Sequence, residues 1–414
     1  MSDPIAALRT EFPGTEETIY LDVAARGLIS RGVRGVIDEY LDHRMFEGGD
    51  KAQMFAGAEA ARDSLAGLIG ASPEEVAFTK NVSDGINAFA HAIDWVEGDN
   101  VVICEALEHP ANIFPWRNLA RRRGIRVKQV HAHEGRVPLE RVIEAIDART
   151  RVVTVSSVSF SPGFRFPVAE LGAICRERGV LLLVDAAQSL GILDTDVSKL
   201  HADAVAVSTQ KGLLGLYGAG FLYVRNEVAQ TLQPLYLSRA GVGGGVHEAS
   251  SGDLDAFDFA DGARRFDVGN HNFCAVLAVG RSIEDLRALG MPRVEAHACG
   301  LARRLAEGLE EVGLPVFGGA AADDRAHIVS MGRKLSDEHD RTEDSELVAL
   351  HDFLTRNRVR LTIRRGMMRF SLHVYNNDDD VDEVISLARA WRSETAPRGG
   401  TRGLRHEIQQ REAG

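Results

Sequence analysis

Short apolar runs alternate with amphipathic stretches over most of the first two thirds of the chain. The runs that predict strands are "EEVAFT" (74–79), "NVVICEA" (100–106), "IRVKQV" (125–130), "RVVTVSSVS" (151–159), "GVLLLVDAA" (179–187), "ADAVAVS" (202–208) and "AGFLYVR" (219–225). Several of them have no polar face, which is typical of strands buried on both sides of a parallel sheet. Stretches with helical spacing lie between them, at 83–96, 113–124 and 168–179. This alternation predicts an α/β fold with an open, mostly parallel sheet flanked by helices.

The pattern changes after residue 239. Residues 239–272 are rich in Gly and Asp and have no periodicity, which predicts a long surface loop. Helical spacing then returns at 273–290, 291–313 and 378–392, with short strands near 326–332 and 359–376. We therefore expect four parts: an N-terminal arm (1–17), a large domain (18–272), a smaller α+β domain (273–394) and a polar, disordered tail (395–414).

Composition narrows the class of protein. The 414 residues are 44% apolar and 26% charged with a net charge of −12, which disfavours binding to nucleic acid. The four cysteines, Cys104, Cys175, Cys274 and Cys299, have no CxxC spacing, so we expect buried thiols in a reducing compartment. The sequence lacks a signal peptide and any apolar run of the roughly 18–20 residues that span a membrane. We expect a soluble, cytoplasmic protein.

Two charged residues stand at the ends of neighbouring predicted strands. Asp185 follows the apolar run "LLLV", and Lys211 follows the run 202–208 in the small polar sequence "STQKG". Taken singly, such an aspartate is most often a turn or helix-cap residue, and such a lysine a solvated surface charge. A buried carboxylate, however, needs a partner, and a desolvated lysine can form an imine. Ligands of parallel sheets bind beyond the carboxyl ends of the strands, where both residues are expected.

Together, "VDAAQSLG" (184–191) and "STQKG" (208–212) resemble the core of the aminotransferase class V family, which includes cysteine desulfurases, C–S lyases and isopenicillin-N-epimerase-like proteins. The resemblance extends over residues 18–392. It implies a fold-type-I enzyme that uses pyridoxal 5'-phosphate, with a seven-stranded type of sheet in its large domain and active sites at a homodimer interface. In that setting Lys211 would hold the cofactor aldehyde, and Asp185 would keep the pyridine nitrogen protonated.

The resemblance assigns further residues to the cofactor. "FTKNVSDGINAF" (78–89) resembles a phosphate-binding turn at a helix N-terminus. The histidine of "LEHPANIFPW" (107–116) is expected to stack on the pyridine ring, and a glutamine shortly after Asp185 is expected beside the phenolic oxygen. "RFDVGNHNF" (265–273) resembles a segment that reaches the phosphate of the partner subunit. The cofactor-binding residues so assigned are Asn81, Val82, Ser83, His109, Gln188, Ser208, Gln210 and Asn270, besides Asp185 and Lys211.

Four positions depart from the family pattern. Val23 in "YLDVAARG" and Ser157 in "VSSVSFSPG" stand where relatives often have Asn, so no cofactor contact is assigned to them. Gln210 stands where many relatives have His. Asn270 stands where Thr is usual, and an amide can donate to a phosphate as a hydroxyl does.

A late signature points to the substrate. In "MMRFSLHVYNNDDDVDEV" (367–384), Arg369 is the expected bidentate partner of the substrate α-carboxylate, the alternative being an ion pair with a structural acid. His373 on the same stretch is expected to support the strand. The catalytic residues implied by the resemblance are thus Lys211, His109 and Asp185, with Arg369 binding the substrate.

The sequence indicates the cofactor more specifically than it indicates the reaction. Lys211 is the expected base for Cα–H abstraction from an external aldimine. Desulfurases carry a cysteine shortly before the late arginine, but the interval "RLTIRRGMMRF" (360–370) has none. We therefore rank β-elimination of the C–S lyase type first, and transamination, epimerisation and a decarboxylation-linked reaction stay open. A non-catalytic binding protein is disfavoured because Lys211 and Asp185 are both present, and "HAH" (131–133) lacks a third ligand for a metal.

Overall fold

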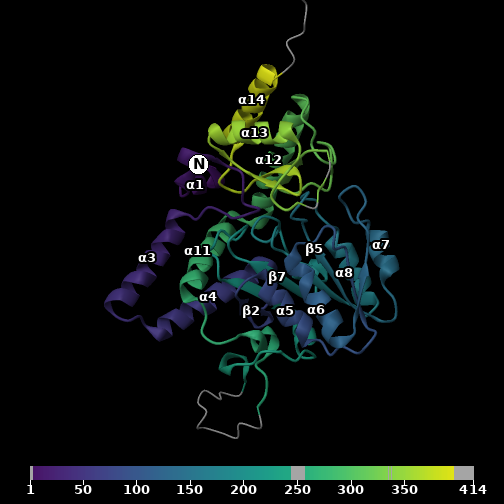
Figure 1. The fold of residues 1–414 in the computed structure, drawn as a ribbon. Helices are drawn as coiled ribbons and strands as arrows, with labels where there is room; N and C mark the ends of the chain where they lie inside the picture. Colours follow the sequence, from purple (N-terminus) through teal and green to yellow (C-terminus); the bar gives the residue numbers. More distant parts are fainter. Residues whose placement is uncertain (1–2, 244–256, 334, 337, 396–414) are drawn as a thin grey trace, which may run out of the picture.

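The computed structural model of the 414-residue chain describes residues 3–243, 257–333, 335–336 and 338–395. Its central feature is a seven-stranded sheet in the order β2-β8-β7-β6-β5-β3-β4 (Figure 1). The strands are β2 (Val76–Thr79), β3 (Asn100–Ile103), β4 (Arg126–Gln129), β5 (Thr150–Ser156), β6 (Leu181–Asp185), β7 (Ala204–Ser208) and β8 (Gly220–Val224). Only β8 runs antiparallel to its neighbours, β2 and β7. The sheet is therefore mostly parallel, as the apolar runs predict.

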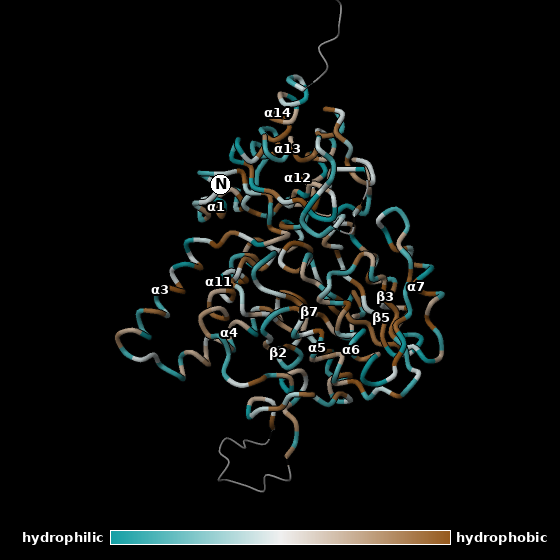
Figure 2. Tube along the Cα trace, viewed as in Figure 1, coloured by the Kyte–Doolittle hydropathy of each residue, from teal (hydrophilic) through white to brown (hydrophobic). Residues whose placement is uncertain are grey.

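Helices cover both faces of this sheet. They are α3 (Arg31–Phe46), α4 (Lys51–Ile69), α5 (Val82–Ala92), α6 (Phe114–Arg123), α7 (Leu139–Ala145), α8 (Val168–Glu177), α9 (Val197–Leu200), α10 (Asn226–Ala229) and α11 (Phe273–Leu289). Short 3-10 helices η1 (Pro73–Glu75), η2 (Pro110–Asn112), η3 (Arg239–Gly241) and η4 (Gly262–Phe266) join them. Along β6, Leu182 and Val184 pack into a core shared with α4, α8 and α11, whereas Leu183 packs into a core shared with α5 and α6. The strand thus has no polar face because its alternate side chains enter two apolar layers. Figure 2 shows the hydrophobic residues of the labelled strands β3, β5 and β7 in brown.

A smaller α+β unit lies above the sheet in Figure 1. It contains an antiparallel sheet in the order β11-β12-β9, formed by β9 (Ile328–Met331), β11 (Thr362–Arg364) and β12 (Met367–Ser371). Its helices are α12 (Met291–Glu311), α13 (Ser345–Arg356) and α14 (Asp378–Thr395), and a third apolar core joins them to this sheet. The strands and the last helix agree with those expected near 326–332, 359–376 and 378–392.

The start of the chain lies against the smaller unit. Two short helices, α1 (Pro4–Arg9) and α2 (Gly14–Glu17), precede β1 (Ile19–Tyr20), which pairs in parallel with β10 (Val359–Arg360). Arg9 makes an ion pair of 2.8 Å with Asp380 of α14. Conversely, α11, which the sequence places in the small domain, packs mainly against α3 and α4 of the larger unit. The domain limits drawn from the sequence stay predictions.

Some segments differ from what the sequence pattern indicates or lie outside the description. The helices α3 and α4 were not predicted. The expected loop 239–272 contains η3 and η4, and its central residues 244–256 lie outside the described part of the chain. The same holds for 396–414, so the expected disorder of the tail stays a prediction. None of the helices that the structure describes is both long and apolar enough to cross a membrane.

A buried ion pair ties α4 to β2 and to the end of η4. Arg62 of α4 donates to Asp267 at 2.8 Å, and both side chains are almost fully buried. The second carboxylate oxygen of Asp267 accepts the Phe78 backbone N–H at 2.8 Å. The Arg62 guanidinium also lies 4.2 Å from the centre of the Phe78 ring. Loss of Asp267 would leave the buried Arg62 charge only partly compensated, by the more exposed Glu59 at 3.1 Å.

We expect Asp267→Ala to lower the free energy of unfolding by about 3–5 kcal/mol, because Arg62 would lose its buried counter-ion. Urea unfolding followed by circular dichroism measures this loss. The control is Asp38→Ala, which breaks the exposed Arg34–Asp38 pair of 2.8 Å within α3. For such an exposed pair a much smaller loss is expected, because water screens both charges. Similar losses in the two variants would contradict the assignment.

Candidate active site

A cavity of about 530 Å³ opens at the carboxyl ends of β5, β6 and β7, where the large unit faces the smaller one. It is lined by every site residue predicted from the sequence except Asn270: Asn81, Val82, Ser83, His109, Asp185, Gln188, Ser208, Gln210, Lys211 and Arg369. The smaller unit adds Arg364 and His339 to its wall. Residues more than 280 positions apart in the chain thus meet at one edge of the sheet.

Asp185 is the last residue of β6 and is 3% exposed. One carboxylate oxygen accepts the Ala187 backbone N–H at 2.9 Å. Burial raises the pKa of Asp185, and the Ala187 N–H and the Lys211 charge oppose this rise. The structure describes no ion pair for this carboxylate, so it lines the cavity as an acid that lacks a close cation. A protonated ring nitrogen of a ligand would supply one.

Lys211 follows β7 on a tightly held turn. The Gly27 N–H donates to the Gln210 carbonyl at 2.8 Å, and His373 Nε2 donates to the Gly212 carbonyl at 2.8 Å. A Cβ on Gly212 would lie 2.4 Å from the Leu190 carbonyl oxygen, so this position accepts only glycine. Burial lowers the pKa of Lys211 to about 8, although Asp185 opposes this effect. A lysine with such a lowered pKa has an appreciable fraction of neutral amine, which can act as nucleophile and base.

The N-terminus of α5 forms another part of the wall. Asn81 caps this helix, because its side chain accepts the Asp84 N–H at 3.0 Å. The Val82 N–H donates to the Ser208 hydroxyl at 2.8 Å, so the Ser208 proton is left for a ligand. Helix N-termini bind phosphate through unpaired N–H groups and the helix dipole. The sequence predicts that the Val82 N–H binds a phosphate, but in the structure this N–H already donates to the Ser208 hydroxyl.

His109 presents a neutral ring to the cavity. Its Nδ1 accepts the Ala111 N–H at 3.2 Å, which places the single proton of the neutral ring on Nε2. Burial lowers the pKa of His109 to about 4, and the Lys211 and His339 charges add to this effect. Phe160 packs edge-on against the ring at 5.4 Å and 87°. An uncharged imidazole with an open face suits stacking on an aromatic ligand.

Two buried polar groups at the cavity lack partners among the described residues. Gln188 donates to the Ala24 carbonyl at 3.0 Å, but its Oε1 has no partner. Arg369 donates to the Phe160 carbonyl at 2.8 Å and lies 3.7 Å from Asp22, while its Nε has no partner. Burial lowers the pKa of Arg369 to about 10. Its guanidinium is thus close to the structural acid Asp22 and also lines the cavity. Both predicted roles of Arg369, binding a substrate carboxylate and pairing with a structural acid, stay open.

Other lining residues escaped the sequence analysis. Phe160, Tyr217, Arg364 and His339 line the cavity without having been singled out. They stand on loops or short strand ends, where hydrophobic periodicity carries no signal. Arg364 lies inside the interval 360–370, for which the sequence predicts only that the desulfurase cysteine is absent. Neither periodicity nor motif spacing predicts that these residues converge, because the two units that supply them are distant in sequence.

Asn270 lies outside the cavity of its own chain. It is exposed and lines a neighbouring hollow that shares Lys80 and Gly218 with the cavity. Ser157, at the position where relatives often have Asn, also does not line the cavity. Its hydroxyl lies 2.6 Å from that of Ser189. The assignment of Asn270 to a partner's cofactor stays a prediction.

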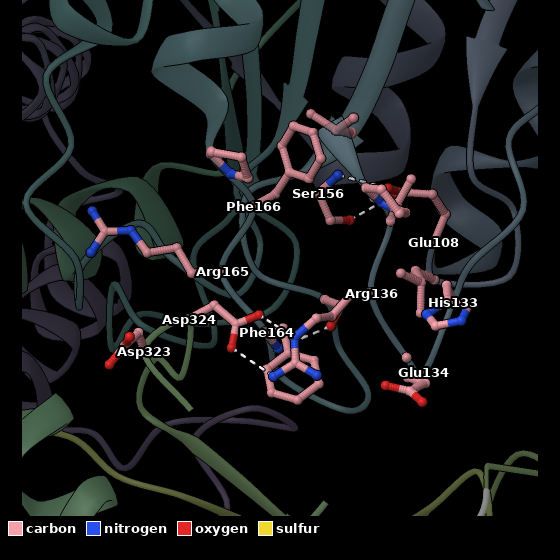
Figure 3. A pocket seen from close by; sticks show the side chains of 17 residues that line it. Glu108, His133, Glu134, Arg136, Ser156, Phe164, Arg165, Phe166, Asp323 and Asp324 are labelled. Atoms are coloured by element: carbon pink, nitrogen blue, oxygen red, sulfur yellow. Dashed lines mark hydrogen bonds and ion pairs between the residues drawn. The ribbon is translucent and has the colours of Figure 1, made fainter. Parts of the chain in front are cut away.

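A second cavity of about 630 Å³ lies behind Ser156, which lines both spaces (Figure 3). Glu108 stands at one end and accepts hydrogen bonds from the Ser156 N–H (2.7 Å), the Ser156 hydroxyl (2.6 Å) and Asn112 (2.9 Å). At the other end Arg136 pairs with Asp324 at 2.5 Å (Figure 3). Within the described ranges no three His, Cys, Asp or Glu side chains are grouped as a metal site requires. The cavity with Lys211 is the candidate active site because it brings together nearly all of the predicted site residues.

Comparison with known proteins fits this geometry. The sequence model of the aminotransferase class-V family matches residues 19–384. The chain belongs to this family. Its membership confirms the predicted fold-type-I α/β architecture, the predicted enzyme and the predicted cofactor, pyridoxal phosphate. The buried carboxylate, the amine, the helix N-terminus and the unpartnered Gln188 oxygen are groups that fit this cofactor.

Relatives across the family cover nearly the whole chain. A probable cysteine desulfurase of Pyrococcus abyssi is 30% identical over 92% of this chain and 96% of its own length. Another, from Methanothermobacter thermautotrophicus, is 31% identical over 90% and 94%. The solved apo structure of a cysteine desulfurase from Thermococcus onnurineus has a TM-score of 0.82 and 27% identity, covering 95% of this chain and 99% of its own. A structure of C-DES with glycine covalently linked to its PLP cofactor shares the fold, with a TM-score of 0.81 and 22% identity over 94% and 99%.

Glu108 yields a prediction about pH. Burial, with a contribution from the Asp185 charge, raises its pKa from 4.5 to about 7. The folded state therefore binds a proton that the unfolded state releases, and stability falls as the pH rises from 4.5 to 7. One pKa unit corresponds to roughly 1.4 kcal/mol, so this group accounts for up to about 3 kcal/mol of the loss. In the cofactor-free protein we expect Glu108→Gln to flatten the fall, as measured by urea unfolding at several pH values.

The control for this experiment is Glu97→Gln, at an exposed position. It is expected to reproduce the wild-type pH profile of unfolding. If Glu108→Gln also follows the wild-type profile between pH 4.5 and 7, Glu108 does not carry this dependence.

Proposed function

We propose that this class-V enzyme is a pyridoxal-phosphate-dependent lyase that eliminates a sulfur leaving group from Cβ of an amino acid. The observation that carries the proposal is the burial of the Lys211 amine and the Asp185 carboxylate at one cavity whose walls contain no cysteine among the described residues. β-Elimination needs a base at Cα and a leaving group at Cβ, and it does not need a nucleophilic thiol.

In this proposal the large unit holds the cofactor. Lys211 binds the aldehyde carbon, Asp185 faces the ring nitrogen, and His109 covers the ring. The α5 N-terminus at Asn81, Val82 and Ser83, together with Ser208, binds the phosphate. Gln188 faces the phenolic oxygen, with Gln210 beside it. When bound, the cofactor withdraws electrons from the bonds at the substrate Cα.

The substrate is held by groups from both units. Arg369, which lines the cavity and whose Nε has no partner among the described residues, binds the α-carboxylate, and this fixes the orientation of the Cα–H bond. Lys211 removes the Cα proton, and its pKa of about 8 leaves much of the amine neutral at mildly alkaline pH. The Cβ substituent then leaves with its bonding electrons, and hydrolysis of the product yields pyruvate and ammonia.

The cysteines set this chain apart from the mechanism implied by the names of its relatives. Burial raises the pKa of Cys104 and Cys299 to about 11 and that of Cys175 to about 12. The pKa of Cys274 is raised as well. None of the four thiols lines the cavity. Buried thiols with raised pKa values are poor nucleophiles, which supports elimination over transfer of sulfur to an enzyme cysteine.

The test is product analysis with a panel of amino acids that includes S-substituted cysteines. We expect pyruvate and a free thiol in equimolar amounts, and a loss of at least 10³-fold with Lys211→Ala, because the base and the cofactor linkage are both removed. Lys211→Ala is also expected to lack the visible absorption of the lysine-linked cofactor. The control Lys199→Ala changes an exposed lysine of α9 and is expected to retain both. An amino group transferred to a keto acid, or inversion with solvent deuterium at Cα, would favour transamination or epimerisation instead.

We also propose that the protein acts as a homodimer in which Asn270 contacts the partner's cofactor phosphate. The hollow that contains Asn270 is bordered by the exposed apolar side chains Leu235, Tyr236 and Val268, which are 46%, 59% and 53% exposed. Apolar side chains clustered at the surface are typical of protein interfaces. The hollow adjoins the α5 N-terminus through Lys80, so a partner segment seated there lies next to the phosphate site.

Subunit mixing tests this arrangement. Asn270→Ala alone is expected to weaken cofactor binding about 10-fold, the effect of losing one hydrogen bond to a charged group. When Asn270→Ala and Lys211→Ala subunits are mixed, each hybrid dimer contains one site with both native residues. Mixing is therefore expected to restore cofactor affinity and activity to that fraction of sites. Full activity of a monomer in dilute solution, or no recovery on mixing, would contradict the shared site.

A further inference from the structure

A sulfur leaving group needs a proton, and the groups already placed in the cavity do not supply it well. Under the proposed function, on which this inference rests, Lys211 accepts the Cα proton and Asp185 faces the ring nitrogen. His109 has a pKa lowered to about 4 and is held neutral by the Ala111 N–H. The other imidazole that lines the cavity is His339, which stands on the connection between β9 and α13.

His339 is oriented by a neighbouring carboxylate. Its Nδ1 lies 2.5 Å from Asp340 Oδ1, which leaves Nε2 as the nitrogen available to a ligand. The ring packs nearly parallel to Phe160 at 6.4 Å and 22°, and Phe160 contacts His109 on its other side. A carboxylate on one ring nitrogen fixes the orientation of the imidazole, and the protonated ring can donate through its other nitrogen.

The smaller unit holds this segment over the turn between β11 and β12. The Arg365 N–H donates to the His339 carbonyl at 3.1 Å, and the Gly366 N–H donates to the Arg341 carbonyl at 3.1 Å. Arg364 donates to Asp340 at 2.5 Å. This turn belongs to the interval 360–370, just before Arg369, where the sequence lacks the cysteine of desulfurases. The imidazole therefore stands on the side of the cavity where the substrate side chain is expected.

We infer that His339, oriented by Asp340, is the general acid that protonates the departing sulfur. The Cα–H bond breaks and its proton passes to Lys211. The electron pair left at Cα forms the Cα=Cβ bond, and the Cβ–S bond breaks with its pair on sulfur. Sulfur takes the proton from His339 Nε2 and leaves as a thiol. With one water, the substrate then gives thiol, pyruvate and ammonium, so no oxidant or reductant is needed.

The experiment compares two leaving groups in one variant. With S-methylcysteine the departing thiolate is basic and needs the acid, whereas chloride leaves β-chloroalanine without a proton. His339→Gln is expected to lower kcat for S-methylcysteine by at least 100-fold more than for β-chloroalanine, within the range typical of a lost general acid. Asp340→Asn is expected to act in the same direction by a smaller factor, because Asp340 positions the ring. The control His351→Gln alters a histidine on α13 that also neighbours an aspartate but lies outside the cavity.

Two further measurements separate the possible outcomes. The Kd for pyridoxal phosphate, read from visible absorption, and the exchange of the substrate Cα–H in deuterium oxide are both expected to stay within about threefold of wild type in His339→Gln. Equal losses for both substrates, or loss of cofactor binding, would overturn the role of His339. If the wild type releases no pyruvate even from β-chloroalanine, the proposed lyase function itself fails, and this outcome is distinct from the other two.

Discussion

The site depends on a carboxylate buried at the end of a strand. Asp185 is 3% exposed, and the structure describes only one backbone N–H that donates to its side chain. A carboxylate in that position is costly unless a cation meets it, and the Lys211 amine is not in ion-pair contact with it. A ligand with a protonated ring nitrogen would supply the missing cation. In the cofactor-free state the buried carboxylate without a close cation lowers the free energy of unfolding.

The sheet determines where Lys211 lies relative to Asp185. Asp185 pairs in register with Ala206 on β7, so the loop after β7 begins beside the buried acid. That loop is then held from three sides, by Gly27, by Leu190 at Gly212, and by His373 from the smaller unit. Since His373 bonds to the residue after Lys211, the position of the amine depends on how the two units dock. The hydrogen bond from His373 to the Gly212 carbonyl shows that this histidine of the late signature positions the turn of Lys211.

The strands and most of the residues that line the cavity were predictable because each depends on local signals. Buried strands produce continuous apolar runs, and Asp185, Lys211 and His109 stand in short motifs at the strand ends. Glu108 and His339 were not predictable in this way. Glu108 follows an unremarkable turn, and its raised pKa comes from burial and from the charge of Asp185, which only the sheet brings near, while hydrogen bonds from Ser156 oppose the rise. His339 reaches the cavity through backbone hydrogen bonds to a turn 26 residues later, which no periodicity records.

The two units contribute different groups to the cavity. The groups assigned to the cofactor stand at the strand ends of the parallel sheet, on the loops that follow them and at the start of α5, which packs with the sheet in one apolar core. The groups that line the cavity from the smaller unit, Arg364, His339 and Arg369, stand on short strands and a connecting loop, and the proposed substrate contacts come from them. Changes in those loops alter which leaving group is stabilised without disturbing the Asp185–Lys211 geometry. A family that keeps one cofactor site can therefore change its reaction through a few residues of the smaller unit. This chain has no cysteine just before the late arginine, and the turn there instead holds the segment that carries the His339 imidazole, the proposed proton donor.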